Sequence, residues 1–113
     1  MRVIVAGSRD ITSYDVVAKA IELSGFEITT VLSGTARGVD TLGEAWVLRN
    51  GIPIEYFSAD WDRLGNRAGM VRNAQMADKA EALIAVWDGA SKGTHNMIHT
   101  ADRKGLKVFI HRV

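Results

Sequence analysis

The sequence contains no cysteine, and its only proline is Pro53. Without thiols the chain forms no disulfide, has no cysteine nucleophile and offers no cysteine ligand to zinc. Its 14 lysines and arginines against 13 aspartates and glutamates give a formal net charge of +1. That balance lacks the excess of basic residues typical of nucleic-acid-binding proteins, so a nucleic-acid partner is not expected.

Long apolar stretches are missing as well. A membrane helix needs ~20 apolar residues and a secretory signal needs ~7–15, whereas the first apolar run covers only residues 3–6. We therefore expect a cytoplasmic protein with no membrane partner.

What the sequence does contain is typical of one globular domain. Of its 113 residues, 47% are hydrophobic and 24% are charged, which is an ordinary globular composition. No low-complexity linker divides the chain, and its length is that of one domain. We predict a single domain over residues 1–113.

Five short apolar segments alternate with segments of helical periodicity. The apolar segments cover residues 3–6, 28–32, 54–57, 82–87 and 106–110. The first and fourth are almost wholly apolar, as expected of strands covered on both faces. Strands that alternate with helices form parallel sheets with right-handed crossovers. We predict an α/β fold, a doubly wound Rossmann-like domain with a five-stranded, mainly parallel sheet and helices on both faces.

Helix boundaries can be predicted from their end residues. Thr12 and Asp15 have the spacing of a capping box, and Gly25 is a typical residue to end that first helix. The second helix is predicted to end near residues 50–51, the third to cover 69–79 and the fourth 94–104.

Three loops that follow predicted strands combine glycine, a hydroxyl group and a cationic side chain. In a parallel sheet these loops meet at the carboxyl edge, where ligands of such folds bind. Glycine allows close backbone approach, and helix amino termini attract anions. Any one loop is equally well explained as a turn, but three at one edge favour a phosphate site. The ligand-binding residues predicted from these loops are Gly7, Ser8, Arg9, Ser33, Gly34, Arg37, Gly38, Asp40, Gly93 and Thr94.

The connection over residues 58–69 is long and polar, and such a connection in a small domain is usually functional. Trp61 is a candidate for stacking on a base, with a packing role over the next helix as the alternative. Arg72 either faces the ligand or pairs with Asp60 or Asp62, and we favour the ligand.

Several catalytic patterns are absent. The sequence has no Gly-x-Gly-x-x-Gly after its first strand, no P-loop ending in Gly-Lys-Ser/Thr and no Gly-x-Ser-x-Gly. His95, His99 and Asp102 share one helix face. We expect that face to be solvated, and we predict no metal site.

Four motifs, in order along the chain, resemble those of the SLOG superfamily, and of its YspA-like branch in particular. They are Val-Ala-Gly-Ser-Arg-Asp at 5–10, Ser-Gly-x-Ala-Arg-Gly-Val-Asp at 33–40, Ala-Gly-x-x-Arg-Asn-x-x-Met at 68–76 and Gly-Thr at 93–94. The resemblance implies a Rossmann-like fold that binds nucleotides or their derivatives. The superfamily includes LOG phosphoribohydrolases, which release a base from nucleoside monophosphates, and DprA-type proteins, which bind single-stranded DNA.

One position departs from the enzymes of this superfamily. Their Arg-Lys-x-x-Met motif aligns with Arg72 and Asn73, and this resemblance implies a ligand-binding role for these two residues. Their Gly-Gly-x-Gly-Thr-x-x-Glu motif carries a catalytic glutamate, but here Met97 occupies its position. Methionine cannot stabilise the positive charge that develops when an N-glycosidic bond breaks. An aspartate from another loop could take the place of the missing glutamate. The aspartates considered are Asp10, Asp40, Asp60 and Asp88.

Three hypotheses follow. The first is a module that binds a nucleotide-type ligand as a sensor, sequestering protein or carrier, with no other cofactor assigned. The second is a LOG-type nucleotide N-glycosidase, with Asp10, Asp40 and Arg72 as candidate catalytic residues. The third is a DprA-like binder of single-stranded nucleic acid. We also expect a homo-oligomer, a dimer or higher, in which Trp46, Trp61 or Trp87 anchors the interface.

Overall fold

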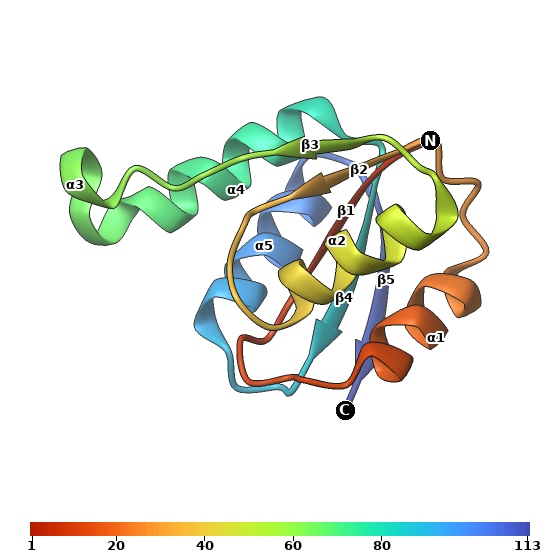
Figure 1. Cartoon of the computed structure of the whole chain (residues 1–113). Coiled ribbons are helices and arrows are strands. Elements are labelled where there is room, and N and C mark those ends of the chain that lie inside the picture. The colour runs from red at the N-terminus through yellow and green to blue at the C-terminus, as the bar shows by residue number, and fades with distance from the viewer.

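The computed structural model describes all residues from 1 to 113. The chain forms five strands and five α-helices, with at least one helix between each pair of consecutive strands and one short 3₁₀ helix, η1 (Figure 1). The elements are β1 (Arg2–Gly7), α1 (Tyr14–Ser24), β2 (Thr30–Ser33), α2 (Val39–Asn50), β3 (Ile54–Tyr56), α3 (Trp61–Leu64), η1 (Gly65–Arg67), α4 (Ala68–Lys79), β4 (Ala82–Trp87), α5 (Lys92–Arg103) and β5 (Lys107–Arg112). None of the helices combines the length and the apolar character needed to cross a membrane.

The five strands form one sheet in the order β3-β2-β1-β4-β5, and every neighbouring pair is parallel. The chain moves outward from β1 to β3, then returns to the other side of β1 to form β4. This confirms the predicted doubly wound α/β fold. The direction of winding reverses between β1 and β4, so their carboxyl ends define the position where such sheets bind ligands.

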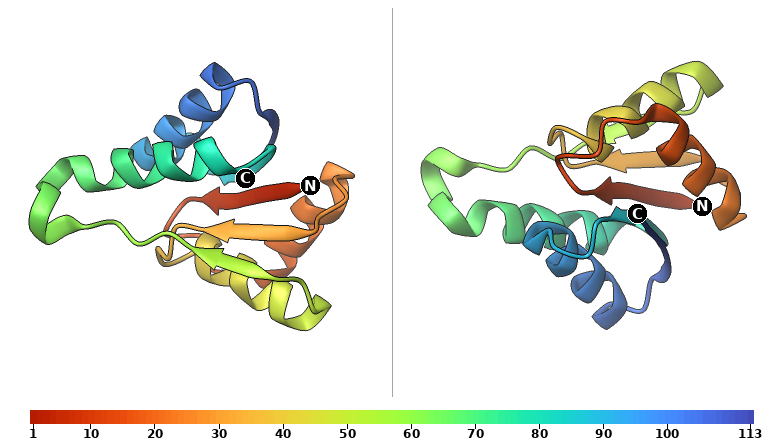
Figure 2. Two further views of the ribbon diagram at one scale, coloured as in Figure 1. Left: turned by 90° about the horizontal axis from the view of Figure 1, so that it is seen from above. Right: turned by 90° about the horizontal axis from the view of Figure 1, so that it is seen from below.

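Alternate residues of each strand supply two cores, one on each face of the sheet. Val3 and Val5 of β1 pack with α1 and α2, while Ile4 and Ala6 pack with α4 and α5. Figures 1 and 2 show these helix pairs on opposite sides of the sheet. Because both faces are covered, the first and fourth strands are almost wholly apolar.

The first helix shows where the sequence pattern is misleading. Its N-cap is Ser13, whose hydroxyl accepts a hydrogen bond from the N–H of Val16 at 3.3 Å. The predicted capping box of Thr12 and Asp15 is therefore wrong, because the neighbouring serine takes the capping position. Gly25 does end the helix in a left-handed conformation, with φ of 69°.

The connection between β3 and α4 holds α3 and η1, which the sequence did not predict. Both views of Figure 2 show α3 projecting beyond the carboxyl edge of the sheet. Its main contacts are with η1 and with α4. Helix α5 starts at Lys92, two residues earlier than predicted, so Gly93 lies in its first turn rather than in a loop.

Candidate functional site

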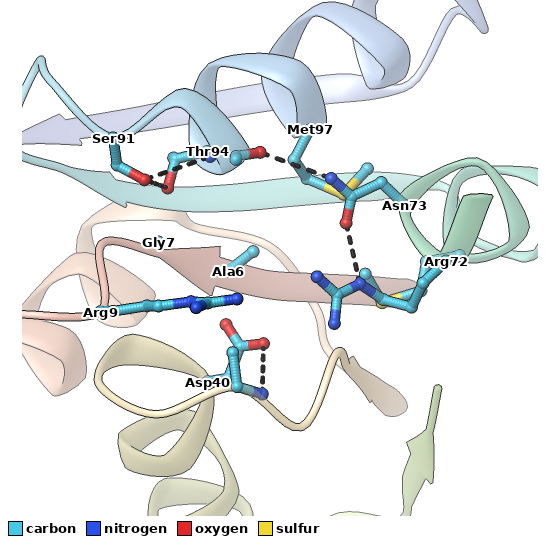
Figure 3. A pocket seen from close by; sticks show the side chains of 12 residues that line it. Ala6, Gly7, Arg9, Asp40, Arg72, Asn73, Ser91, Thr94 and Met97 are labelled. Atoms are coloured by element: carbon cyan, nitrogen blue, oxygen red, sulfur yellow. Dashed lines mark hydrogen bonds between the residues drawn. The ribbon is translucent and has the colours of Figure 1, made fainter. Parts of the chain in front are cut away.

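Two connected cavities open at the carboxyl ends of β1 and β4. The inner chamber has a volume of about 60 Å³ and is lined by Ala6, Gly7, Arg9, Ala36, Asp40, Arg72, Asn73, Met76, Ser91, Gly93, Thr94 and Met97 (Figure 3). The outer chamber has a volume of about 430 Å³ and is lined by Arg9, Trp61, Asn66, Gly69, Met70, Arg72, Asn73, Ser91, Lys92, Gly93 and Asn96. Because five residues line both, the two chambers form one continuous site at the predicted edge of the sheet.

Arg72 and Asn73 of α4 line both chambers. The Arg72 guanidinium donates to the carbonyl oxygen of Gly34 and, through Nε, to Oδ1 of Asn73 at 3.0 Å. Asn73 in turn donates to Oδ1 of Asn96 on α5 at 2.9 Å. Burial lowers the pKa of Arg72, while nearby Asp40 raises it; an arginine remains charged under such shifts. The proposed pairing of Arg72 with Asp60 or Asp62 is not found, since Asp60 pairs with Arg63.

Asp40 forms the wall of the inner chamber opposite α5. It is only 5% exposed, and its Oδ2 accepts a hydrogen bond from the N–H of Ala36 at 3.2 Å. Burial raises its pKa from 3.8 to about 6, although the Ala36 hydrogen bond and the charge of Arg72 act in the opposite direction. The site therefore holds a carboxylate that ionises close to neutral pH.

The loop from β2 to α2 has no room for side chains beside this carboxylate. A Cβ at Gly34 would lie 2.8 Å from Oδ2 of Asp40 and 2.9 Å from Nη1 of Arg72. Gly38, with φ of 76°, lies against the backbone of Ser8 and Arg9, where a Cβ would come within 2.6 Å of both carbonyl oxygens. Glycine at these two positions lets the β2–α2 loop reach both Arg72 and the loop after β1.

Arg9 and Trp61 border the outer chamber. The Arg9 guanidinium lies 6.0 Å from the centre of the Trp61 ring, within the range of a cation–π contact. Trp61 is 49% exposed, and a Cβ at Gly69 on α4 would lie 3.4 Å from its ring. Trp61 thus presents a half-exposed ring to the outer chamber and lies against α4.

Three predicted hydroxyl residues are engaged by the protein itself. Ser8 is buried, and its Oγ accepts from the N–H of Asp88 at 3.1 Å. The Ser33 hydroxyl donates to Oε2 of Glu44 at 2.6 Å. The Thr94 hydroxyl donates to Oγ of Ser91 at 3.0 Å. Ser8 and Ser33 line neither chamber, so the structure places them as supports of the loops.

Arg37 and Asp10 also lie outside both chambers. They form an exposed ion pair, with 3.6 Å between Nη2 and Oδ1. They line a shallow groove of about 320 Å³ together with Arg9, Asp88, Ala90 and Ser91. Hydrogen bonds from the N–H groups of Ala90 and Ser91 lower the pKa of Asp88. Of the four aspartates considered from the sequence, Asp40 is the one that lines the inner chamber.

Helix α5 brings its amino terminus and Met97 to the site. Ser91 is its N-cap and accepts from the N–H of Thr94. Gly93 is exposed, and a Cβ there would contact nothing. Met97 is buried in the core on that face of the sheet and forms part of the inner chamber wall. The side chain at this position is therefore at the site, but it is apolar.

Sequence reasoning missed several residues of the site. Ser91 lines both chambers and the shallow groove, Asn96 binds Asn73, and Asn66 and Lys92 line the outer chamber. Ser91 and Lys92 belong to the glycine-containing loop after the fourth predicted strand, so the sequence indicated that segment without selecting these two side chains.

The two histidines of α5 lie elsewhere. His95, His99 and Asp102 are exposed, and the rings of His95 and His99 stack with centroids 6.2 Å apart. Together with Ile98, Val108 and Ile110 they line a separate cavity of about 350 Å³ against the edge strand β5.

Comparison with known proteins gives three matches. A family model described as "YspA, cpYpsA-related SLOG family" matches residues 1–64. The Gene 61 protein of Mycobacterium phage D29 is 32% identical over 117 aligned residues, which cover 95% of this chain and 93% of the phage protein. The structure of DNA processing protein A (DprA) from Streptococcus pneumoniae aligns with a TM-score of 0.77 at 20% identity.

The alignment with DprA covers 96% of this chain but 49% of the DprA chain, so this protein spans about half the length of that neighbour. At 20% identity the likeness concerns the fold. The family match covers more than half of the sequence, including β1, β2 and the loops that follow them, and it agrees with the resemblance found in the motifs. The chain belongs to the YspA, cpYpsA-related SLOG family.

Proposed function

We propose that this protein binds a nucleotide or a nucleotide-derived phosphorylated ligand in the two connected chambers, as a sensor, sequestering protein or carrier. The observation that carries the proposal is that cationic side chains and one aromatic side chain line the same cavity. Arg9, Arg72 and Lys92 line the outer chamber together with Trp61. Cations and the amino terminus of a helix attract phosphate, and an open indole ring stacks on a base.

Binding rather than cleavage is supported by Met97, which occupies the catalytic position of the related hydrolases. The cytoplasmic location and the homo-oligomer expected from the sequence remain predictions. A nucleic-acid partner gains no support from a net charge of +1.

The test is isothermal titration of the protein at physiological salt with nucleoside mono-, di- and cyclic monophosphates of all four bases. Arg9→Ala is the informative variant, because Arg9 lines both chambers and its side chain forms no hydrogen bond within the protein. Loss of a charge-assisted contact should weaken binding about 10-fold to 100-fold. Arg63→Ala is the matched control, since Arg63 is exposed and lines neither chamber. Failure of every nucleotide to bind, or equal binding by Arg9→Ala, would refute the proposal.

A second candidate function is hydrolysis of a nucleotide N-glycosidic bond, and the observation that favours it is the position of Asp40. Its buried carboxylate has a raised pKa and faces the chamber from the wall opposite Met97. Such a group can accept a proton from an attacking water. Incubation with nucleoside monophosphates followed by chromatography would detect a released base. If Asp40→Asn abolishes the release of base, the result supports the N-glycosidase. If no base is released over many hours, the N-glycosidase is refuted and the binding function remains.

A further inference from the structure

Asp40 provides a hydrogen-bond acceptor that the protein leaves unused. Its Oδ2 is bound by the N–H of Ala36, whereas Oδ1 has no donor within the protein. No buried side-chain atom of the molecule lacks a hydrogen-bond partner, so Oδ1 must be reached from the chamber. Figure 3 shows the carboxylate between the side chains of Arg9 and Arg72, directed into the cavity.

The neighbouring arginines do not satisfy this oxygen. Arg9 and Arg72 lower the pKa of Asp40 by their charge, yet neither guanidinium comes within 4.0 Å of its carboxylate as an ion pair. Arg72 instead donates to Gly34 and Asn73. Oδ1 is open to the chamber, so it is an acceptor that a donor group on a bound ligand can use.

The size and charge of the inner chamber limit which part of a nucleotide supplies that donor. A volume of about 60 Å³ corresponds to a few water-sized probes, which suits small groups such as hydroxyls better than a nucleobase. Asp40 is the only acidic side chain of either chamber, and a phosphate in direct contact with its carboxylate would be repelled. Sugar hydroxyls are small, neutral and able to donate.

We infer that Asp40 accepts hydrogen bonds from the ribose hydroxyls of the ligand and so makes the site selective for ribonucleotides over 2′-deoxyribonucleotides. The sugar edge lies in the inner chamber against Asp40. The phosphate lies toward Arg9 and Lys92, and the base lies toward Trp61 in the outer chamber. This inference rests on the proposed nucleotide binding and assigns the orientation of the ligand.

The experiment compares AMP, 2′-deoxy-AMP and 3′-deoxy-AMP, and the corresponding guanosine nucleotides, by isothermal titration. The wild-type protein should bind at least one ribonucleotide roughly 10-fold or more tightly than its deoxy analogue, because a hydrogen bond to a charged acceptor is lost. In Asp40→Asn the ratio should fall to below about 3-fold, because the charge is removed while the shape is kept.

Glu44→Gln is the matched control. Glu44 lies on the same helix, binds Ser33 and lines neither chamber, so this variant should keep the wild-type ratio. Circular dichroism confirms that each variant is folded. Equal binding of ribo- and deoxyribonucleotides by the wild-type protein overturns the inference while nucleotide binding stands. An unchanged ratio in Asp40→Asn overturns it as well, and absence of all nucleotide binding removes both proposals.

Discussion

The carbonyl oxygen of Val86 lies so close to Gly7 that a Cβ at Gly7 would be 2.1 Å from it. Gly7 and Val86 are partners in the parallel register of β1 and β4, and the N–H of Ser8 donates to the same oxygen at 3.0 Å. The two central strands therefore stay paired to their carboxyl ends, which sets the floor of the site.

Gly7→Ala should destabilise the fold by several kcal/mol, because a methyl group cannot fit against a backbone oxygen at that distance. Gly93→Ala is the contrast, since its Cβ meets nothing within 4 Å and the position is helical. That variant should be neutral or stabilised by roughly 0.5–1 kcal/mol. Urea unfolding of both variants measures the difference, and equal effects would contradict this account.

Asp40 should make stability depend on pH. Its pKa is about 6 in the folded protein against a usual 3.8, so the folded state holds the proton more tightly than the unfolded state. The stability that protonation contributes is fully present below pH 3.8 and is lost as the pH rises through about 6. The loss amounts to about 3 kcal/mol.

The neutral variant Asp40→Asn should escape this loss. Its free energy of unfolding should exceed that of the wild type by up to ~3 kcal/mol at pH 7.5, and the excess should shrink toward pH 4. Arg9, Arg72 and Glu44 are the charged groups that act on Asp40. Urea titrations at several pH values measure the difference in unfolding free energy between variant and wild type. A difference that does not change with pH would contradict this prediction.

Ser8→Ala should cost about 1–2 kcal/mol, because the N–H of Asp88 loses its acceptor on the buried Ser8 hydroxyl. The exposed Ser58, whose Oγ accepts one long hydrogen bond of 3.5 Å from Thr35, provides the control Ser58→Ala with an expected effect near zero. Thermal unfolding of the two variants measures the difference. An equal melting temperature in both would show that the Ser8 hydroxyl does not stabilise the fold.

Trp61→Ala should weaken nucleotide binding without much loss of stability. The side chain is 49% exposed, so unfolding should change by less than ~1 kcal/mol. Loss of a stacking contact should weaken binding about 5-fold to 100-fold in isothermal titration. Tyr56→Ala removes an exposed aromatic side chain of β3 outside both chambers and should bind as the wild type does. Weaker binding by both variants would point to a general effect on the fold.

Features that depend on neighbouring residues were predictable from the sequence. The apolar runs located all five strands, and Gly25 marked the end of α1. The capping residue was misplaced by one position, since Thr12 and Ser13 are both good N-caps and only the path of the backbone chooses between them. The helix α3 was missed because four residues carry too little periodicity to be recognised.

The site depended on contacts between distant parts of the chain. Ser8 and Ser33 have the residue type of a phosphate site, but their hydroxyls are bound by Asp88 and Glu44. Four aspartates looked equivalent in the sequence, and packing alone brought Asp40 into the chamber. Ser8 binds Asp88, 80 positions away in the sequence, and Arg72 binds Gly34, 38 positions away.

The sequence by itself therefore determined the order of strands and helices, and with it the edge of the sheet where the loops gather, because hydrophobic periodicity and glycine positions act locally. Only the tertiary structure decided which side chains of those loops are free to meet a ligand. The hydroxyls of Ser8 and Ser33 form hydrogen bonds within the protein, whereas one oxygen of Asp40 stays open to the chamber.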